Sequence, residues 1–178
     1  MSHADRLQAA DGFAHDAQTV ARIVSRLLRG AHLTAIYVTG DFRLEFTKGA
    51  ERADTIPRVT CLTMFSDWWV NDRSHWEAFL KTPVAFGAPS KAKEEAMKAY
   101  ALVCLYRGGA EVKDIALGED GTLLISTSMG VLAISGQEDV FEESWILEVP
   151  KGLPDHDKWS VVCTSTGELL GRPANLTL

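Results

Sequence analysis

The chain has 178 residues, of which 46% are hydrophobic and 24% are charged, a balance typical of a globular protein with a core of its own. Its formal net charge of −6 arises entirely after residue 89, because ten bases and ten acids come before residue 90 whereas eight bases and fourteen acids follow. We therefore expect no nucleic-acid partner, since phosphate binding relies on clustered Lys and Arg, and no membrane partner, since apolar runs of membrane-spanning length and a signal-peptide pattern are both lacking. These features predict a cytoplasmic protein.

A helix and a hairpin are expected first along the chain. Residues 14–29 carry apolar side chains at spacings of three and four, and this pattern predicts an amphipathic helix that ends at Gly30. The stripe consists of Val20, Ile23, Val24, Leu27 and Leu28. LTAIYVT and FRLEFT then flank a Gly40-Asp41 turn, and the alternation of Phe42, Leu44 and Phe46 with polar residues predicts a half-buried hairpin.

Further strands and a short helix complete the first half. The runs VTCLTMF and WWV are typical of strands, and Asn71-Asp72 is expected to begin a helix over RSHWEAFLK. Pro83 and the segment FGAPS at 86–90 indicate a boundary between residues 1–89 and 90–178.

The second half is expected to repeat this order. Residues 90–107 predict a helix that ends at Gly108-Gly109, followed by strands VKDIALG, TLLIST, GVLAIS and SWILEV and a final hairpin from WSVVCTS to ELLGR. The helix is expected to bury an apolar stripe formed by Met97, Tyr100, Ala101, Val103 and Cys104. Short hairpin connections favour antiparallel pairing, so the predicted class is α+β.

An internal repeat supports this organisation. Residues 30–46 align without a gap with residues 109–125, and five of the seventeen positions are identical. The alignment places Leu44 with Leu123 and Phe46 with Ile125. We therefore expect two tandem helix-plus-antiparallel-sheet units, 1–89 and 90–178, that share one core.

Motifs for catalysis or metal binding are lacking. The sequence has no GxSxG elbow, no phosphate-binding glycine loop and no histidines at ligand spacing, and Asp155-His156-Asp157 is interpreted as a solvated turn. Cys61, Cys104 and Cys163 each lie in an apolar run and are expected to be buried free thiols. We expect no enzymatic activity, no metal and no cofactor, although residues that meet only in three dimensions leave an enzyme open.

A tryptophan cluster is the first candidate for recognition. SDWWVNDRSHWEAF places Trp68 and Trp69 between Asp67 and Asp72. Adjacent residues of a strand point to opposite faces, so one tryptophan can enter the core while the other cannot. The second tryptophan either anchors a partner or is covered by the helix over 73–81.

An acidic loop is the second candidate. SGQEDVFEES gathers four carboxylates around the apolar pair Val140 and Phe141. They belong to Glu138, Asp139, Glu142 and Glu143. Such a loop can steer and dock a basic partner, or it can be an ordinary solvated loop that keeps the protein soluble.

In three features the chain resembles the immunity proteins of bacterial polymorphic and contact-dependent toxin systems. These features are the layout over residues 14–178, the DWWV and ESWIL strands, and the QEDVFEES loop. The resemblance implies a cytoplasmic protein that binds and blocks one cognate toxin domain, often a basic one. Two alternatives remain: a small-molecule-binding or enzymatic α+β domain with a pocket between the repeats, and a structural subunit whose sheet edges pair with another copy.

Overall fold

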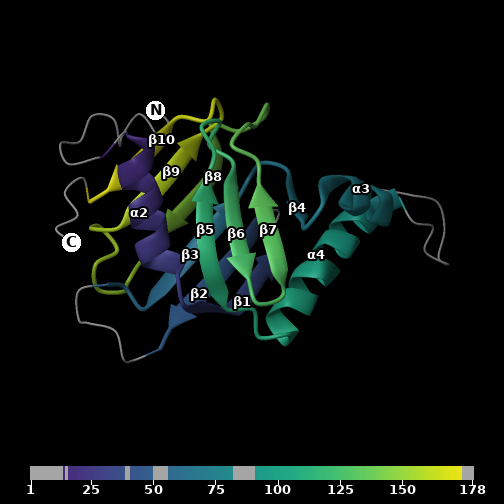
Figure 1. The fold of residues 1–178 in the computed structure, drawn as a ribbon, viewed down its shortest axis with the longest axis horizontal. Helices are drawn as coiled ribbons and strands as arrows, with labels where there is room; N and C mark the ends of the chain where they lie inside the picture. Colours follow the sequence, from purple (N-terminus) through teal and green to yellow (C-terminus); the bar gives the residue numbers. More distant parts are fainter. Residues whose placement is uncertain (1–13, 15, 39–40, 50–55, 82–90, 174–178) are drawn as a thin grey trace.

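The computed structural model describes residues 14, 16–38, 41–49, 56–81 and 91–173, and these form an α+β fold, as expected (Figure 1). The helices are α2 (Ala17–Leu28), α3 (Arg73–Lys81) and α4 (Lys91–Arg107). The strands are β1 (Ala31–Val38), β2 (Phe42–Lys48), β3 (Val59–Met64), β4 (Trp68–Val70), β5 (Val112–Leu117), β6 (Leu123–Thr127), β7 (Gly130–Ile134), β8 (Glu143–Glu148), β9 (Ser160–Thr164) and β10 (Leu169–Arg172). None of the helices within these ranges has the length and apolar character needed to cross a membrane.

Both sheets are antiparallel and take strands from both halves of the chain. One has six strands in the order β1-β2-β3-β8-β9-β10, and the other has four in the order β4-β7-β6-β5. Strand β8 of the second half pairs with β3, whereas β4 of the first half pairs with β7. Figure 1 shows β5, β6 and β7 in front of the larger sheet, with α2 at one end and α3 and α4 at the other. The buried side chains of both halves form a single core cluster.

Helix α2 follows the predicted pattern. The Asp16 side chain caps its start by accepting a hydrogen bond of 2.7 Å from the Thr19 amide. All five residues of the predicted stripe are buried, and Gly30, with a φ of 75°, follows the helix end. The helix packs against β5, β9 and β10, so the first helix of the chain covers strands of the second half.

Only part of the stripe predicted for α4 faces the core, since Ala101 packs against it but Tyr100, Val103 and Cys104 are exposed. Among the described side chains of α4, Leu102 and Leu105 are the buried ones, and Tyr100 is 64% exposed. Apolar residues lie on several sides of this helix, so spacing alone does not decide which side is buried. Consequently Cys61 and Cys163 are the buried free thiols that were expected, but Cys104 is exposed.

The internal repeat is not confirmed and stays a prediction, but the first hairpins of the two halves share details. His32 pairs with Glu111, its counterpart in the alignment, and each hairpin has a bulge at the corresponding place, between Leu33 and Ala35 and between Val112 and Asp114. The alignment nevertheless needs a gap. Ile36 lies opposite Leu44, eight residues on, whereas Ile115 lies opposite Ile125, ten residues on. Structurally, Leu44 therefore corresponds to Ile125 and not to Leu123, because the second turn is two residues longer.

A glycine junction joins the two sheets, formed by Gly121, Gly136 and Gly167. The backbone of the β5–β6 turn approaches that of the β9–β10 turn so closely that a Cβ on Gly121 would lie 2.6 Å from the Cys163 sulfur and 2.9 Å from the Gly167 carbonyl oxygen. The Gly121 carbonyl accepts a hydrogen bond of 3.0 Å from the indole nitrogen of the fully buried Trp145 on β8. The junction therefore leaves no room for side chains at these glycines.

We expect Gly136→Ala to be strongly destabilising, because its Cβ would collide with the Asp120 carbonyl and the Gly121 backbone. The free energy of unfolding, measured by urea titration, should fall by about 3 kcal/mol or more. Gly49→Ala is the control, since its Cβ would meet nothing within 4 Å. That variant should stay within about 0.5 kcal/mol of the parent. Equal stability of the two variants would show that the junction tolerates a side chain.

Thiol exposure gives a second prediction. Burial raises the pKa of Cys163 to about 12 and also raises that of Cys61, so neither should be a thiolate near pH 8. Titration of the native protein with Ellman's reagent should therefore detect one fast thiol, and unfolding in guanidinium should release the other two. Cys104→Ser should remove the fast phase, and a fast phase that survives this substitution would contradict the burial described above.

Candidate functional site

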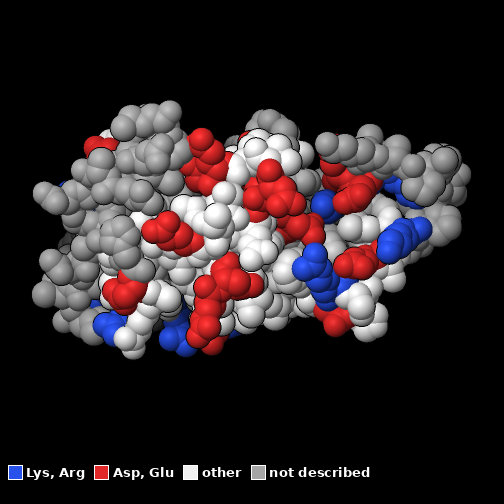
Figure 2. Space-filling model, turned by 90° about the horizontal axis from the view of Figure 1, so that it is seen from above, with Lys and Arg blue, Asp and Glu red and all other residues white. Residues whose placement is uncertain are grey.

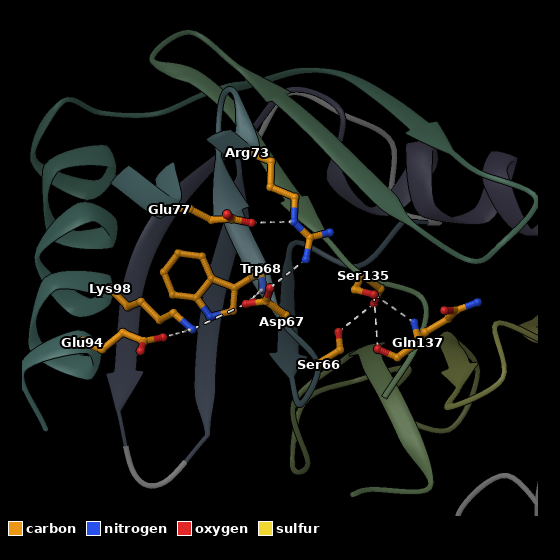
Figure 3. A network of polar contacts seen from close by, with 9 residues as sticks. All are labelled: Ser66, Asp67, Trp68, Arg73, Glu77, Glu94, Lys98, Ser135 and Gln137. Carbon is orange, nitrogen blue, oxygen red and sulfur yellow. Dashed lines mark hydrogen bonds and ion pairs between the residues drawn. The ribbon is translucent and has the colours of Figure 1, made fainter. Parts of the chain in front are cut away.

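The β3–β4 connection makes backbone contacts with Ser135 and Ser144, the two ends of the segment that holds the acidic loop. The amides of Phe65 and Ser66 both donate to the Ser144 carbonyl at 3.0 Å, and the Ser135 amide donates to the Asp67 carbonyl at 2.9 Å. The Ser66 hydroxyl adds a bond of 2.6 Å to the Ser135 carbonyl (Figure 3). The two segments singled out in the sequence, the tryptophan cluster and the acidic loop, therefore lie side by side.

The tryptophans of β4 point to opposite faces, as a strand requires. Trp68 is 2% exposed, and its ring centroid lies 5.1 Å from that of Phe42 and 5.3 Å from that of Trp76. Trp69 is half-buried, and the Arg73 guanidinium lies 4.7 Å from its ring centroid. Arg73, the first residue of α3, thus covers Trp69, in agreement with the interpretation that the helix over 73–81 covers the second tryptophan. Trp68 belongs to the core and is not an exposed anchor.

Asp67 lies at the centre of a polar network (Figure 3). Its carboxylate lies 3.3 Å from Nη2 of Arg73 on α3 and 3.5 Å from Nζ of Lys98 on α4. These cations pair further with acids on their own helices, Arg73 with Glu77 at 3.5 Å and Lys98 with Glu94 at 3.1 Å. The Lys98 side chain is only 16% exposed. Asp67 therefore has a structural role, since it holds both helices against β4.

The acidic loop has an exposed apolar tip. The Glu138 carboxylate accepts hydrogen bonds of 3.0 Å from the amides of Asp139 and Val140, which fixes the turn. Val140 is 80% exposed and Phe141 is 48% exposed. The tip residues Asp139 and Glu142 are exposed as well, whereas Glu143 begins β8 and is half-buried.

Beside this loop lies a cavity of about 450 Å³, here called the acidic hollow. Aromatic side chains form much of its wall, namely Phe42, Phe65, Trp68 and Phe141. Its charged side chains are Asp41, Glu94, Glu95 and Lys98. Phe141 reaches it from the acidic loop, and its ring centroid lies 5.6 Å from that of Phe65. The hollow is therefore the place where the two predicted segments meet.

Acidic groups extend beyond the hollow. The acidic loop follows β7 at the upper edge of Figure 1, and Figure 2 views the molecule from that side. Red acidic side chains are spread across this face, and blue basic ones are fewer, several of them next to acidic side chains in the right half of the view. This distribution creates a negative potential that attracts cations.

Asp72 lies apart from the other predicted residues, because it caps α3. Its carboxylate accepts hydrogen bonds from the Ser74 hydroxyl at 2.6 Å and the His75 amide at 2.9 Å, and these bonds lower its pKa. It lines a second cavity of about 460 Å³, here called the apolar hollow, together with His75, Trp76, Tyr100 and Cys104. This cavity lies between α3 and α4, at the junction of the two halves of the chain.

Metal binding finds no support in the described part of the chain, where His, Cys, Asp and Glu form no group of three or more that could hold an ion. In the Asp155-His156-Asp157 turn, His156 lies 2.9 Å from Asp157, and Asp155 pairs with Lys158 at 2.6 Å. The turn is therefore satisfied by contacts among its own residues.

The sequence interpretation missed part of the site. Asp41, Glu94, Glu95 and Lys98 were not among the predicted binding residues, although the spacing of Glu94 and Lys98 predicts an ion pair along a helix. Nothing in the sequence places the β1–β2 turn beside the start of α4. No protein-family model, curated protein or solved structure matches the chain.

Substitution of Lys98 tests the network. Lys98→Met should lower the free energy of unfolding by about 1 kcal/mol, because Asp67 and Glu94 lose a largely buried cation. The difference should shrink in high salt, which screens the remaining acids. Lys151→Met removes an equal charge from an exposed side chain and should leave the urea midpoint unchanged. Equal effects of the two substitutions would mean that net charge, and not the network, determines stability.

Proposed function

We propose that this protein is a binding protein that neutralises a cognate bacterial toxin domain, in the manner of an immunity protein. The observation that carries the proposal is the meeting of the acidic loop and the tryptophan segment at one aromatic-walled, acidic hollow. A hollow with an exposed apolar side chain at its edge and carboxylates around it suits a basic protein surface.

Electrostatics supports a basic partner. Between residues 111 and 157 the chain carries eleven acids and two bases. Carboxylates on an exposed loop are little desolvated when a partner first approaches, so their main effect is on the rate of association. Asp139 and Glu142 are placed for this role at the exposed tip of the loop.

The apolar tip supplies the part of the contact that excludes water. Val140 and Phe141 are large hydrophobic side chains exposed beside the hollow. Exposed aromatic side chains next to a pocket are frequent sources of binding energy in protein interfaces. Phe141 is therefore the residue that we expect to contribute most to affinity.

Co-expression with the protein encoded beside this one tests the proposal. The neighbouring product should stop growth of a host cell when expressed alone, and growth should return when the present chain is co-expressed. Purified partners should bind in a titration calorimeter. A neighbouring product that is harmless, or that is toxic and neither binds nor is neutralised, would refute the proposal.

Charge reversal tests the role of the loop in the same assays. Asp139→Lys with Glu142→Lys should weaken binding of the basic toxin domain by about tenfold to a hundredfold, mainly through slower association, and should flatten the salt dependence of the rate. The matched control is Asp114→Lys with Asp157→Lys, which changes the net charge equally away from the loop. Equal losses in both pairs would assign the effect to net charge alone.

A second candidate function is small-molecule binding in the apolar hollow. The supporting observation is that His75, Asn71 and the Asp72 carboxylate lie at a cavity whose other described side chains are mostly apolar and aromatic, a composition common in ligand sites. Under this alternative, Ala101→Trp would fill the hollow and abolish binding of the small molecule. The parent protein would then not neutralise a toxin at all. Retained neutralisation in that variant would favour the first proposal.

A further inference from the structure

Two carboxylates of the acidic hollow have no partner within the described ranges. Glu94 pairs with Lys98, but Asp41 and Glu95 form neither an ion pair nor a hydrogen bond with another described residue. The described residues of the lining include three acids and one base, Lys98, and so carry a net charge of minus two. A cation that enters the hollow therefore gains attraction from carboxylates that the described residues leave unpaired.

The protein's own lysine shows that this wall accepts a cation. Nζ of Lys98 lies 6.0 Å from the centroid of the Trp68 ring while pairing with Glu94 and Asp67. This distance is at the limit of a favourable contact between a cation and an aromatic face. Lys98 thus demonstrates, within the chain, the combination of aromatic ring and carboxylate that would hold a second cation.

The shape of the hollow distinguishes between cations. The Phe65 and Phe141 rings are tilted by 44° to each other, and Phe141 is 48% exposed. A planar guanidinium can stack on such a ring and donate hydrogen bonds sideways to carboxylates on different elements, here the β1–β2 turn and α4. A lysine ammonium is a compact point charge that lacks this stacking surface.

We infer that the acidic hollow binds an arginine side chain of the basic partner, with the guanidinium stacked on Phe141 and donating to Asp41 and Glu95. This inference rests on the proposed function for the identity of the partner but not for the chemistry of the hollow. The hollow then determines which partner is recognised, while Asp139 and Glu142 of the acidic loop speed its association.

A titration with Nα-acetyl-arginine methylamide tests the hollow without a partner. Amide resonances of Phe65 and Phe141 should shift with a saturable dependence, and the Kd should be lower than that for the lysine analogue. The neutral citrulline analogue, which has nearly the same shape, should bind at least about tenfold more weakly. The inference is overturned if citrulline binds as tightly as arginine, or if the shifts map outside the hollow.

Matched variants assign the effect to the two carboxylates. Asp41→Asn with Glu95→Gln should raise the Kd of the arginine analogue by about fivefold to tenfold. Glu119→Gln with Glu111→Gln removes the same charge outside the hollow and should leave the Kd unchanged. Equal Kd values for the parent and the hollow variant would overturn the inference, even if the protein neutralises a toxin. Conversely, if the arginine analogue binds through these carboxylates but the neighbouring product is harmless, the inference about the hollow is supported. In that case only the proposed function is refuted.

Discussion

The close approach of backbones at the glycine junction is the constraint on which the rest of the structure depends. Gly121 and Gly167 bring the β5–β6 and β9–β10 turns into direct contact, and Trp145 ties the smaller sheet to β8 through the Gly121 carbonyl. Because side chains are excluded there, the distance between the two sheets is set by backbone atoms. The loop from Ser135 to Glu142 leaves from this junction, so its position is fixed by the same packing.

Interleaving of the two halves then assembles the site. Strand β4 pairs with β7, and β8 pairs with β3, so segments far apart in the chain become neighbours. Asp41 and Phe65 come from the first half, whereas Glu95 and Phe141 come from the second. Neither half alone contains the acidic hollow. A binding site of this kind depends on the cooperative folding of the whole chain, and mutations that loosen the sheet contacts should weaken binding indirectly.

Acidic groups in this protein serve two different ends. Asp67 is held between Arg73 and Lys98, where its charge is compensated and stabilises the contact of two helices with β4. Asp139 and Glu142 stay at the exposed tip of the loop. Compensated charges contribute to stability, whereas uncompensated ones repel each other until a cation arrives. The net charge of −6 therefore does not distinguish acids that are paired with cations from acids that are exposed on the loop.

The sequence by itself determined the α+β class, the elements and the burial of α2, because apolar spacing and turn residues are local signals. It also identified the tryptophan segment and the acidic loop as distinctive. Which side of α4 is buried, the exposure of Cys104 and the exchange of β4 and β8 were decided only by the tertiary structure. The same holds for the hollow, since Asp41 and Glu95 are ordinary surface acids until packing places them around one cavity. The physical reason is that periodicity reports how one element can be buried, while pairing and approach distance depend on elements remote in the chain.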